Sequence, residues 1–335
     1  MIQSLAVRGT ERVRLGIVGA GLVAQAAHLP ELATLADRFD VVALAEPDAG
    51  ARAIAARRHG IPRTHASWEE LLEAGGLDAA LVCSPNATHA DVTLAALDAG
   101  LHVLVEKPLC LDPGDAERVV AAGDRTGLVV QVGYMKRFDP AYEALLADLP
   151  DGVLHVATET YDPGLREPFG MPAAGAADVY SDIVLGALVH DVNLVRGILD
   201  RCGLAVARVA DAFAGPDGAG GTLELDDATR WTLAWLHLPG LGDFRERVVV
   251  YAADGIRSLD FPAPYLRQAP TVYARSAGTP GGNETRTVRS WREAYRRQLE
   301  HFHACVTAGA ACRAPAEQGA EDVRLLSEMF AGVAA

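Results

Sequence analysis

Short apolar runs alternate with amphipathic segments over residues 13–132. Runs of this length predict strands, and the segments between them, with apolar residues three and four positions apart, predict helices. Because the runs are apolar at nearly every position, we expect parallel strands buried on both faces of a doubly wound α/β sheet. The predicted strands are Val13–Val18, Val41–Ala45, Ala79–Cys83, His102–Val105 and Leu128–Val132.

Local signals mark the ends of several helices in this part of the chain. Ser67 and Glu70 form a capping box, in which each side chain binds a backbone amide of the other. Asp112 and Pro113 supply an N-cap and a first-turn proline, and Gly100 ends a helix. The predicted helices run from Leu22 to about Ala36, through about His59, from about Thr88 to Asp98, and from Pro113 to Thr126.

After Gly133 the pattern changes to strands in which polar and apolar residues alternate. Such strands, separated by turn residues, are typical of an open antiparallel sheet. We therefore expect two domains, residues 1–135 and 136–335, with the C-terminal helices able to pack back on the first. The predicted strands are Val153–Tyr161, Thr222–Leu225, Trp231–His237, Arg245–Tyr251 and Ile256–Leu259, the predicted helices are Pro140–Ala147, Ile183–Leu199, Trp291–Thr307 and Glu321–Gly332, and a loop covers Asp162–Ala177.

The composition narrows the class of protein. The formal net charge is −14, and 50% of the residues are hydrophobic. An acidic surface repels phosphate backbones and anionic lipids, so we expect no nucleic-acid partner and no membrane partner. No apolar run approaches the roughly 20 residues that span a bilayer. The first residues are a poor secretory signal, so we expect a cytoplasmic protein.

The five cysteines form no C-x-x-C pair, and an odd number suits reduced thiols. His301, His303 and Cys305 lie close together in the sequence. On a helix only His301 and Cys305 share a face, and no second cluster completes a tetrahedral set of ligands. We therefore expect no metal.

A glycine-rich turn follows the first predicted strand and opens the first helix. Gly19 permits the tight turn, Gly21 lets the backbone approach a pyrophosphate, and Ala24 lets the helix pack closely on the strand. Glu46 ends the second strand, where a carboxylate accepts ribose hydroxyl groups and repels a 2′-phosphate. The pattern therefore predicts an NAD site and disfavours NADP.

Two further polar segments end the strands that follow. Ser84-Pro85-Asn86, with His89, comes after the strand Ala79–Cys83, and Glu106-Lys107-Pro108 comes after His102–Val105. Ligands of open parallel sheets bind at this edge. Lys107 and Lys136 are the only lysines, against 28 arginines. A desolvated lysine gives up its proton near neutral pH and an arginine does not, so we expect Lys107 to have a chemical role.

These segments resemble the Gfo/Idh/MocA oxidoreductases, which include glucose–fructose oxidoreductase and inositol dehydrogenase. The resemblance is close over the first 140 residues and holds in outline beyond them. It implies an N-terminal Rossmann domain followed by an α+β domain with a mostly antiparallel sheet. It also implies that Lys107 bonds the substrate hydroxyl and the nicotinamide ribose, that its peptide to Pro108 can be cis, that Met135 lines the pocket and that Arg137 stands near it.

The family's second-domain motif, Asp-x-x-x-His-x-x-Asp, resembles the stretch from Gly186 through His190 to Asn193. The spacing puts these three positions on one face of a helix. His190 fits the motif, whereas glycine and asparagine replace the two acids. We expect Asp191 to be structural, since it lies on another face, while Asp182 reaches the site only if the helix begins late. Tyr161 is as well explained by packing as by contact with a substrate.

We predict an NAD-dependent oxidoreductase acting on the CH–OH group of a sugar, sugar derivative or cyclitol, with Lys107 and His190 handling the proton. Two alternatives stay open, a non-catalytic NAD-binding regulatory protein and a redox-neutral isomerase or eliminase that retains NAD. We expect a homodimer or homotetramer, with the strand face that carries Trp231, Leu233, Trp235 and His237 in the core or at the interface. The expected cofactor-binding residues are Gly19, Gly21, Leu22, Val23, Glu46, Ser84, Pro85, Asn86, His89, Glu106 and Lys107, and the expected substrate-binding residues are Lys107, Met135, Arg137, Tyr161, His190 and Asn193.

Overall fold

The computed structural model describes residues 12–163, 184–263, 266, 269–280, 282–291 and 294–333. The described residues form two compact units. The first unit runs to Met135 and takes in residues 295–324 near the C-terminus, and the second begins at Lys136 and takes in the last residues. The guess about Asp182 lies outside the described residues.

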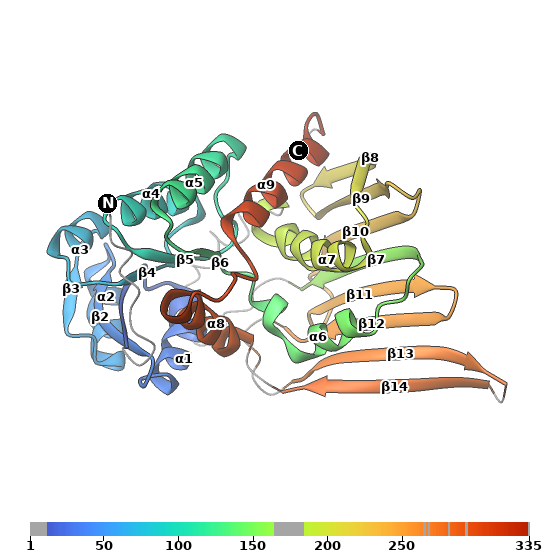
Figure 1. Cartoon of the computed structure of the whole chain (residues 1–335), viewed down its shortest axis with the longest axis horizontal. Helices are drawn as coiled ribbons and strands as arrows, with labels where there is room; N and C mark the ends of the chain where they lie inside the picture. The colour runs from blue at the N-terminus through green and yellow to red at the C-terminus, as the bar shows by residue number, and fades with distance from the viewer. Residues whose placement is uncertain are drawn as a thin grey trace. The chain divides into compact units, whose positions relative to one another are not determined.

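The first unit is built on a six-stranded parallel sheet with the strand order β3-β2-β1-β4-β5-β6 (Figure 1). The strand order reverses between β1 and β4. The loops that follow these two strands therefore start at the same edge of the sheet, at the carboxyl ends of the strands, and run in opposite directions. The doubly wound sheet predicted from the apolar runs is confirmed. Its strands are β1 (Val13–Val18), β2 (Phe39–Ala45), β3 (Arg63–His65), β4 (Ala79–Val82), β5 (His102–Val105) and β6 (Val130–Val132).

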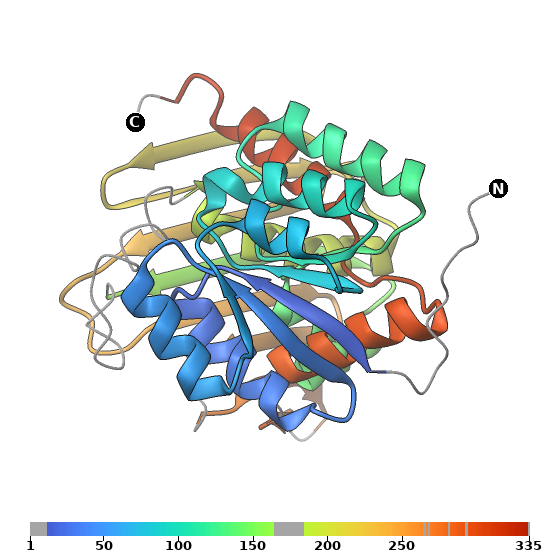
Figure 2. The same cartoon turned by 90° about the vertical axis from the view of Figure 1, so that its left-hand side faces the viewer.

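Helices cover both faces of this sheet. α4 and α5 lie side by side on one face, and α1 and α8 lie on the other (Figures 1 and 2). Leu299, Phe302 and Val306 of α8 join the core under β1. The first helix contains a π-helical segment, Ala24–His28. The helices are α1 (Leu29–Thr34), α2 (Ala49–His59), α3 (Trp68–Ala74), α4 (His89–Asp98), α5 (Pro113–Thr126), α8 (Ala294–Ala308) and α9 (Ala316–Phe330), whose last residues belong to the second unit.

The second unit is built on an eight-stranded sheet with the order β14-β13-β12-β11-β7-β10-β9-β8. Only β7 and β10 pair in parallel, and the other pairs are antiparallel, as predicted. The strands are β7 (Val153–Asp162), β8 (Val206–Gly215), β9 (Gly218–Leu225), β10 (Arg230–His237), β11 (Arg245–Ala252), β12 (Gly255–Phe261), β13 (Thr271–Thr279) and β14 (Gly282–Ser290).

Two helices, α6 (Pro140–Ala147) and α7 (Val189–Cys202), lie over one face of this sheet (Figure 1). A π-helical segment, Val184–Leu188, precedes α7. Trp231, Leu233 and Trp235 face inward and are at most 4% exposed. They therefore belong to the core of this unit, and the interface interpretation of these side chains was wrong.

Sequence reasoning missed four strands, β3, β8, β13 and β14. β3 is three residues long and polar, and most residues of β14 are exposed. The side chains of these segments bury little surface and therefore give no clear strand pattern. The segments are strands because they pair with a neighbouring strand. Among the described helices, none is both long and apolar enough to cross a membrane.

Candidate functional site

The glycine-rich turn between β1 and the first helix contains Gly19 and Gly21, which have different surroundings. Gly19 has a φ of +96°, and a Cβ atom there would collide with the Cys83 carbonyl oxygen. At Gly21 a Cβ atom would meet nothing within 4 Å, and the residue is exposed. The turn is therefore packed against the protein at Gly19 and open at Gly21, where a ligand would contact the backbone.

Glu46 ends β2 beside this turn. One carboxylate oxygen accepts a hydrogen bond from the Ala20 amide at 2.9 Å, and the other accepts one from the Asp48 amide at 3.0 Å. Each oxygen keeps a second lone pair for a ribose hydroxyl. Arg52, in the first turn of α2, donates to the backbone carbonyls of Glu46 and Pro47. A carboxylate and a guanidinium thus stand at the same strand end.

The loops after β4 and β5 are tied to one another by His89. This side chain is 1% exposed, with Nδ1 2.7 Å from the Pro108 carbonyl oxygen and Nε2 2.9 Å from that of Ser84. Burial lowers the pKa of His89, and its contacts with the two carbonyl oxygens oppose that shift. Both ring nitrogens face backbone oxygens, and His89 therefore positions the two loops rather than offering a nitrogen to a cofactor.

The rest of the β4 loop lies closer to solvent. Ser84 and Asn86 are half-buried and Pro85 is exposed. The Thr88 hydroxyl donates to the Ser84 hydroxyl at 2.7 Å and to the Pro85 carbonyl. These bonds close the short turn that begins α4.

Glu106, at the end of β5, forms a buried pair that the sequence did not reveal. Its Oε1 lies 2.6 Å from Nε2 of His28, which is 0% exposed, and its Oε2 accepts from the Lys107 amide at 3.3 Å. A Cβ atom at Gly133 would lie 2.9 Å from this carboxylate, so only glycine fits there. Burial and the nearby Glu106 charge raise the pKa of Cys83, which stays a thiol.

Lys107 follows Glu106 directly and is half-buried. Its peptide bond to Pro108 is cis, in agreement with the family resemblance. Met135, in the turn Met135–Phe138 after β6, is 9% exposed. Lys107 and Met135 belong to the first unit.

The second unit carries the remaining predicted residues. His190 lies in the first turn of α7 and is half-buried, and Asn193 is 1% exposed. Gly186 lies in the π-helical segment, where hydrogen bonds span five residues instead of four. Gly186 thus precedes the α-helix that carries His190 and Asn193, and the shared face of the three residues stays a prediction.

Arg137 and Asn193 bind each other. The Arg137 guanidinium donates to the Asn193 side-chain oxygen at 3.2 Å and to its backbone carbonyl at 3.3 Å. Gly197, one turn further along α7, makes room for this contact, because a Cβ atom there would lie 3.2 Å from the guanidinium carbon. Asn193 therefore presents its amide group with its oxygen already oriented by Arg137.

Tyr161 lies on β7, and its hydroxyl donates to Glu159 at 3.0 Å. Burial and the neighbouring Glu159 raise the pKa of Tyr161, so the phenol stays protonated. The structure thus gives this side chain a partner on its own strand.

Behind α7 lies a buried charged cluster of Lys136, Glu246 and Asp191. Lys136 forms an ion pair with both carboxylate oxygens of Glu246, and its ammonium group lies 5.3 Å from the centre of the Phe261 ring. Asp191, 1% exposed, lies 3.4 Å from the Thr160 hydroxyl. Burial first, and then the Glu246 charge, raise the pKa of Asp191 to about 8. Asp191 is therefore buried within this cluster, and its structural role stays a prediction.

Comparisons with known proteins give a family model, sequence relatives and solved structures that resemble this chain. Residues 13–134 match the family model described as "Oxidoreductase family, NAD-binding Rossmann fold", GFO_IDH_MocA. The chain is 29% identical over 188 residues to a scyllo-inositol 2-dehydrogenase (NAD(+)) of Bacillus subtilis, with 56% of this chain and 54% of that protein covered. It is 40% identical over 193 residues to an inositol 2-dehydrogenase of Leifsonia xyli, with 56% and 53% covered.

The match thus spans about half the length of these two relatives. A solved structure of a 3-ketoreductase from Actinomadura kijaniata with NADP and TDP-benzene superposes with a TM-score of 0.80 at 20% identity, covering 96% of this chain and 98% of the other. At this identity the likeness concerns the fold, and it extends over both units.

Proposed function

Because residues 13–134 belong to the Gfo/Idh/MocA oxidoreductase family, we propose that this chain is an NAD-dependent dehydrogenase or reductase acting on a secondary hydroxyl group or ketone. The proposed substrate is a cyclitol, sugar or sugar derivative, in keeping with the inositol dehydrogenases among its relatives. The observation that carries the proposal is the glycine turn, packed at Gly19 and open at Gly21.

The residues around this turn fit a dinucleotide. The open backbone at Gly21 and the helix that begins at Leu22 and Val23 offer amide donors to a pyrophosphate. Ser84, Pro85 and Asn86 leave the neighbouring β4 strand at the same sheet edge. When bound, the nicotinamide accepts or donates the hydride.

We assign the preference for NAD over NADP to Glu46. Its carboxylate is held by the Ala20 and Asp48 amides, so it cannot easily turn away from a 2′-phosphate, which it repels. Arg52 acts in the opposite direction, because an arginine at this place can bind that phosphate. We propose that the fixed carboxylate outweighs the guanidinium, so that NAD is preferred to NADP.

Lys107 and His190 are the proposed proton-handling residues. Lys107 is kept at the end of β5 by Glu106, which binds its amide and is itself held by His28. His190 is proposed for this role because an imidazole can accept or return a hydroxyl proton at neutral pH. Neither Gly186 nor Asn193 can replace the two acids of the family motif in proton transfer.

Asn193 is the proposed hydroxyl-binding residue of the second unit, since Arg137 fixes its amide orientation. Met135 is proposed to line the pocket. Tyr161 has a weaker case, because its hydroxyl already donates to Glu159. We also propose that the protein is cytoplasmic and forms a homodimer or homotetramer through the outer face of the eight-stranded sheet, where Tyr251, Ile256 and Phe213 are at least 37% exposed.

The test is a search for turnover with the purified protein. We expect NAD to be reduced in the presence of at least one member of a panel of inositol stereoisomers and aldoses, and the corresponding ketone to oxidise NADH. A protein that binds NAD yet gives no NADH and consumes none with any member would contradict the proposal. Conversion of a substrate by protein-bound NAD without net NADH would instead identify a redox-neutral enzyme.

A further inference from the structure

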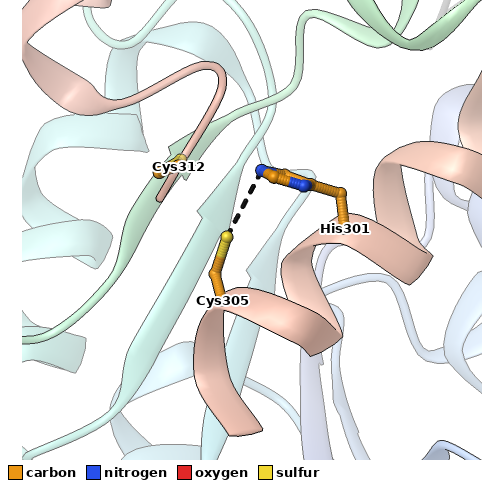
Figure 3. A group of neighbouring side chains, drawn as sticks. All are labelled: His301, Cys305 and Cys312. Atoms are coloured by element: carbon orange, nitrogen blue, oxygen red, sulfur yellow. Dashed lines mark hydrogen bonds between the residues drawn. The ribbon is translucent and has the colours of Figure 1, made fainter. Parts of the chain in front are cut away.

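Three ligand-type side chains come together in the first unit, away from the residues assigned above. They are His301 and Cys305 of α8 and Cys312 of the segment between α8 and α9 (Figure 3). One ring nitrogen of His301 and the two sulfur atoms all lie within 4.8 Å of one another. Sequence reasoning counted only the two ligands that share a helix face, because nothing local places Cys312 beside them.

Chain geometry explains the grouping. His301 and Cys305 are four residues apart on α8 and point toward each other, with the Cys305 sulfur 3.3 Å from Nε2 of His301 (Figure 3). The helix ends before Gly309, whose φ of +64° turns the chain back. The Val132 amide then donates to the Ala314 carbonyl at 2.8 Å, which holds the returning segment and Cys312 against β6.

We propose that His301, Cys305 and Cys312 bind a divalent transition-metal ion, and that Zn²⁺ is the ion whose preferred ligands they supply. Two thiolates and an imidazole are soft and borderline ligands, which select Zn²⁺ over Mg²⁺ or Ca²⁺. In a tetrahedral zinc site, a sulfur and a nitrogen ligand lie about 3.5 Å apart, given the usual bond lengths. The 3.3 Å separation of Cys305 and His301 is close to that value.

Neighbouring groups complete the surroundings. The side-chain oxygen of Gln131, a residue of β6 that is 0% exposed, lies 4.0 Å from the Cys312 sulfur and offers a ligand for the fourth position. The Arg313 amide donates to Nε2 of His301 at 3.0 Å. A metal ion would bind the lone pair of His301 Nε2. The Arg313 amide would then donate its hydrogen bond to a metal-bound thiolate, because a sulfur accepts such bonds. The bound ion would fasten the α8–α9 segment to β6.

The test uses the full-length protein, reduced and treated with a chelator, then titrated anaerobically with Co²⁺ alone. We expect one Co²⁺ per chain with the sulfur-to-metal charge-transfer absorption of thiolate ligation, and loss of that absorption when Zn²⁺ is added. Cys312→Ser should raise the Kd for Co²⁺ by more than about 100-fold. Loss of a ligand should cost more affinity than a change in a group that only holds a ligand in place, which costs up to about 100-fold. Cys312 is partly exposed, so this variant is expected to fold, which circular dichroism checks.

His303→Gln is the matched control, since His303 lies on the same helix but packs edge-on against Phe39 at 5.5 Å. It should bind Co²⁺ like the wild type. The proposal fails if the wild type shows no charge-transfer absorption, or if Cys312→Ser binds Co²⁺ as tightly as the wild type does. It also fails if the protein purified with Zn²⁺ present, then denatured with a chelator and without a reductant, shows three titratable thiols instead of the five in the sequence, because Cys305 and Cys312 would then form a disulfide.

In a second measurement, Zn²⁺ should raise the Tm of the wild type and leave the Tm of Cys312→Ser unchanged. None of these measurements depends on the proposed dehydrogenase activity.

Discussion

The Glu106 carboxylate at the end of β5 lies 2.6 Å from Nε2 of His28, which the π-helical segment Ala24–His28 carries into the core. Both side chains are buried. The pair connects the helix of the glycine turn to the residue that precedes Lys107. Insertion of a residue into a helix to form a π segment often occurs near functional sites, and here it aims a histidine at the predicted site loop.

The His28–Glu106 pair should contribute measurably to stability. His28→Ala leaves a buried carboxylate without its partner, so we expect the free energy of unfolding to fall by about 3 kcal/mol. Urea denaturation of His28→Ala, Glu106→Gln and the double variant measures the interaction. We expect a coupling free energy of at least about 1 kcal/mol. Strictly additive effects of the two substitutions would contradict the interaction.

Lys107 and His190 should each be needed for turnover. Lys107→Ala and His190→Ala are expected to lower kcat by about 100-fold or more while the Kd for NAD changes little, because neither residue is assigned to the pyrophosphate. Lys107→Arg separates charge from proton transfer, since arginine keeps its proton. It should be nearly as slow as Lys107→Ala. Near-normal turnover in both alanine variants would contradict the assignment of Lys107 and His190 to proton transfer.

The predictable parts of this fold are those in which local sequence and burial agree. β1 and α5 begin and end where the apolar run and the caps place them. In contrast, His28 and Glu106 are 78 residues apart, and the partner of Glu106 follows only from the three-dimensional packing. Cys312 is likewise brought to His301 by the turn after α8, which no periodicity reveals. β14, almost wholly exposed, exists because β13 pairs with it.

Cofactor preference should depend on Glu46. Glu46→Ser removes the charge that repels a 2′-phosphate and leaves Arg52 in place, so kcat/KM for NADP relative to NAD should rise by about tenfold, which equals about 1.4 kcal/mol. Adding Arg52→Ala should reverse most of that gain. Arg52→Ala alone is the comparison variant. An unchanged ratio in Glu46→Ser would show that Glu46 does not select the cofactor.

Asp191 should make the protein less stable as the pH rises. Its pKa is raised from 3.8 to about 8 in the fold, by burial first and by the Glu246 charge second, while Lys136 opposes the shift. The folded state therefore holds this proton more tightly than the unfolded chain does. Its stabilising contribution is complete below pH 3.8, decreases as the pH rises and is lost above about 8. The slope is about 1.4 kcal/mol per pH unit between these values.

Asp191→Asn tests this dependence, because an amide keeps a polar group beside the Thr160 hydroxyl and does not titrate in this range. Urea unfolding between pH 5 and pH 8 should give a flatter profile for Asp191→Asn than for the wild type. Asp200→Asn, which changes an exposed carboxylate on the same helix, should leave the wild-type slope unaltered. If the wild type and Asp191→Asn show parallel profiles, then Asp191 is ionised in the fold at neutral pH, and Lys136 neutralises it together with Glu246.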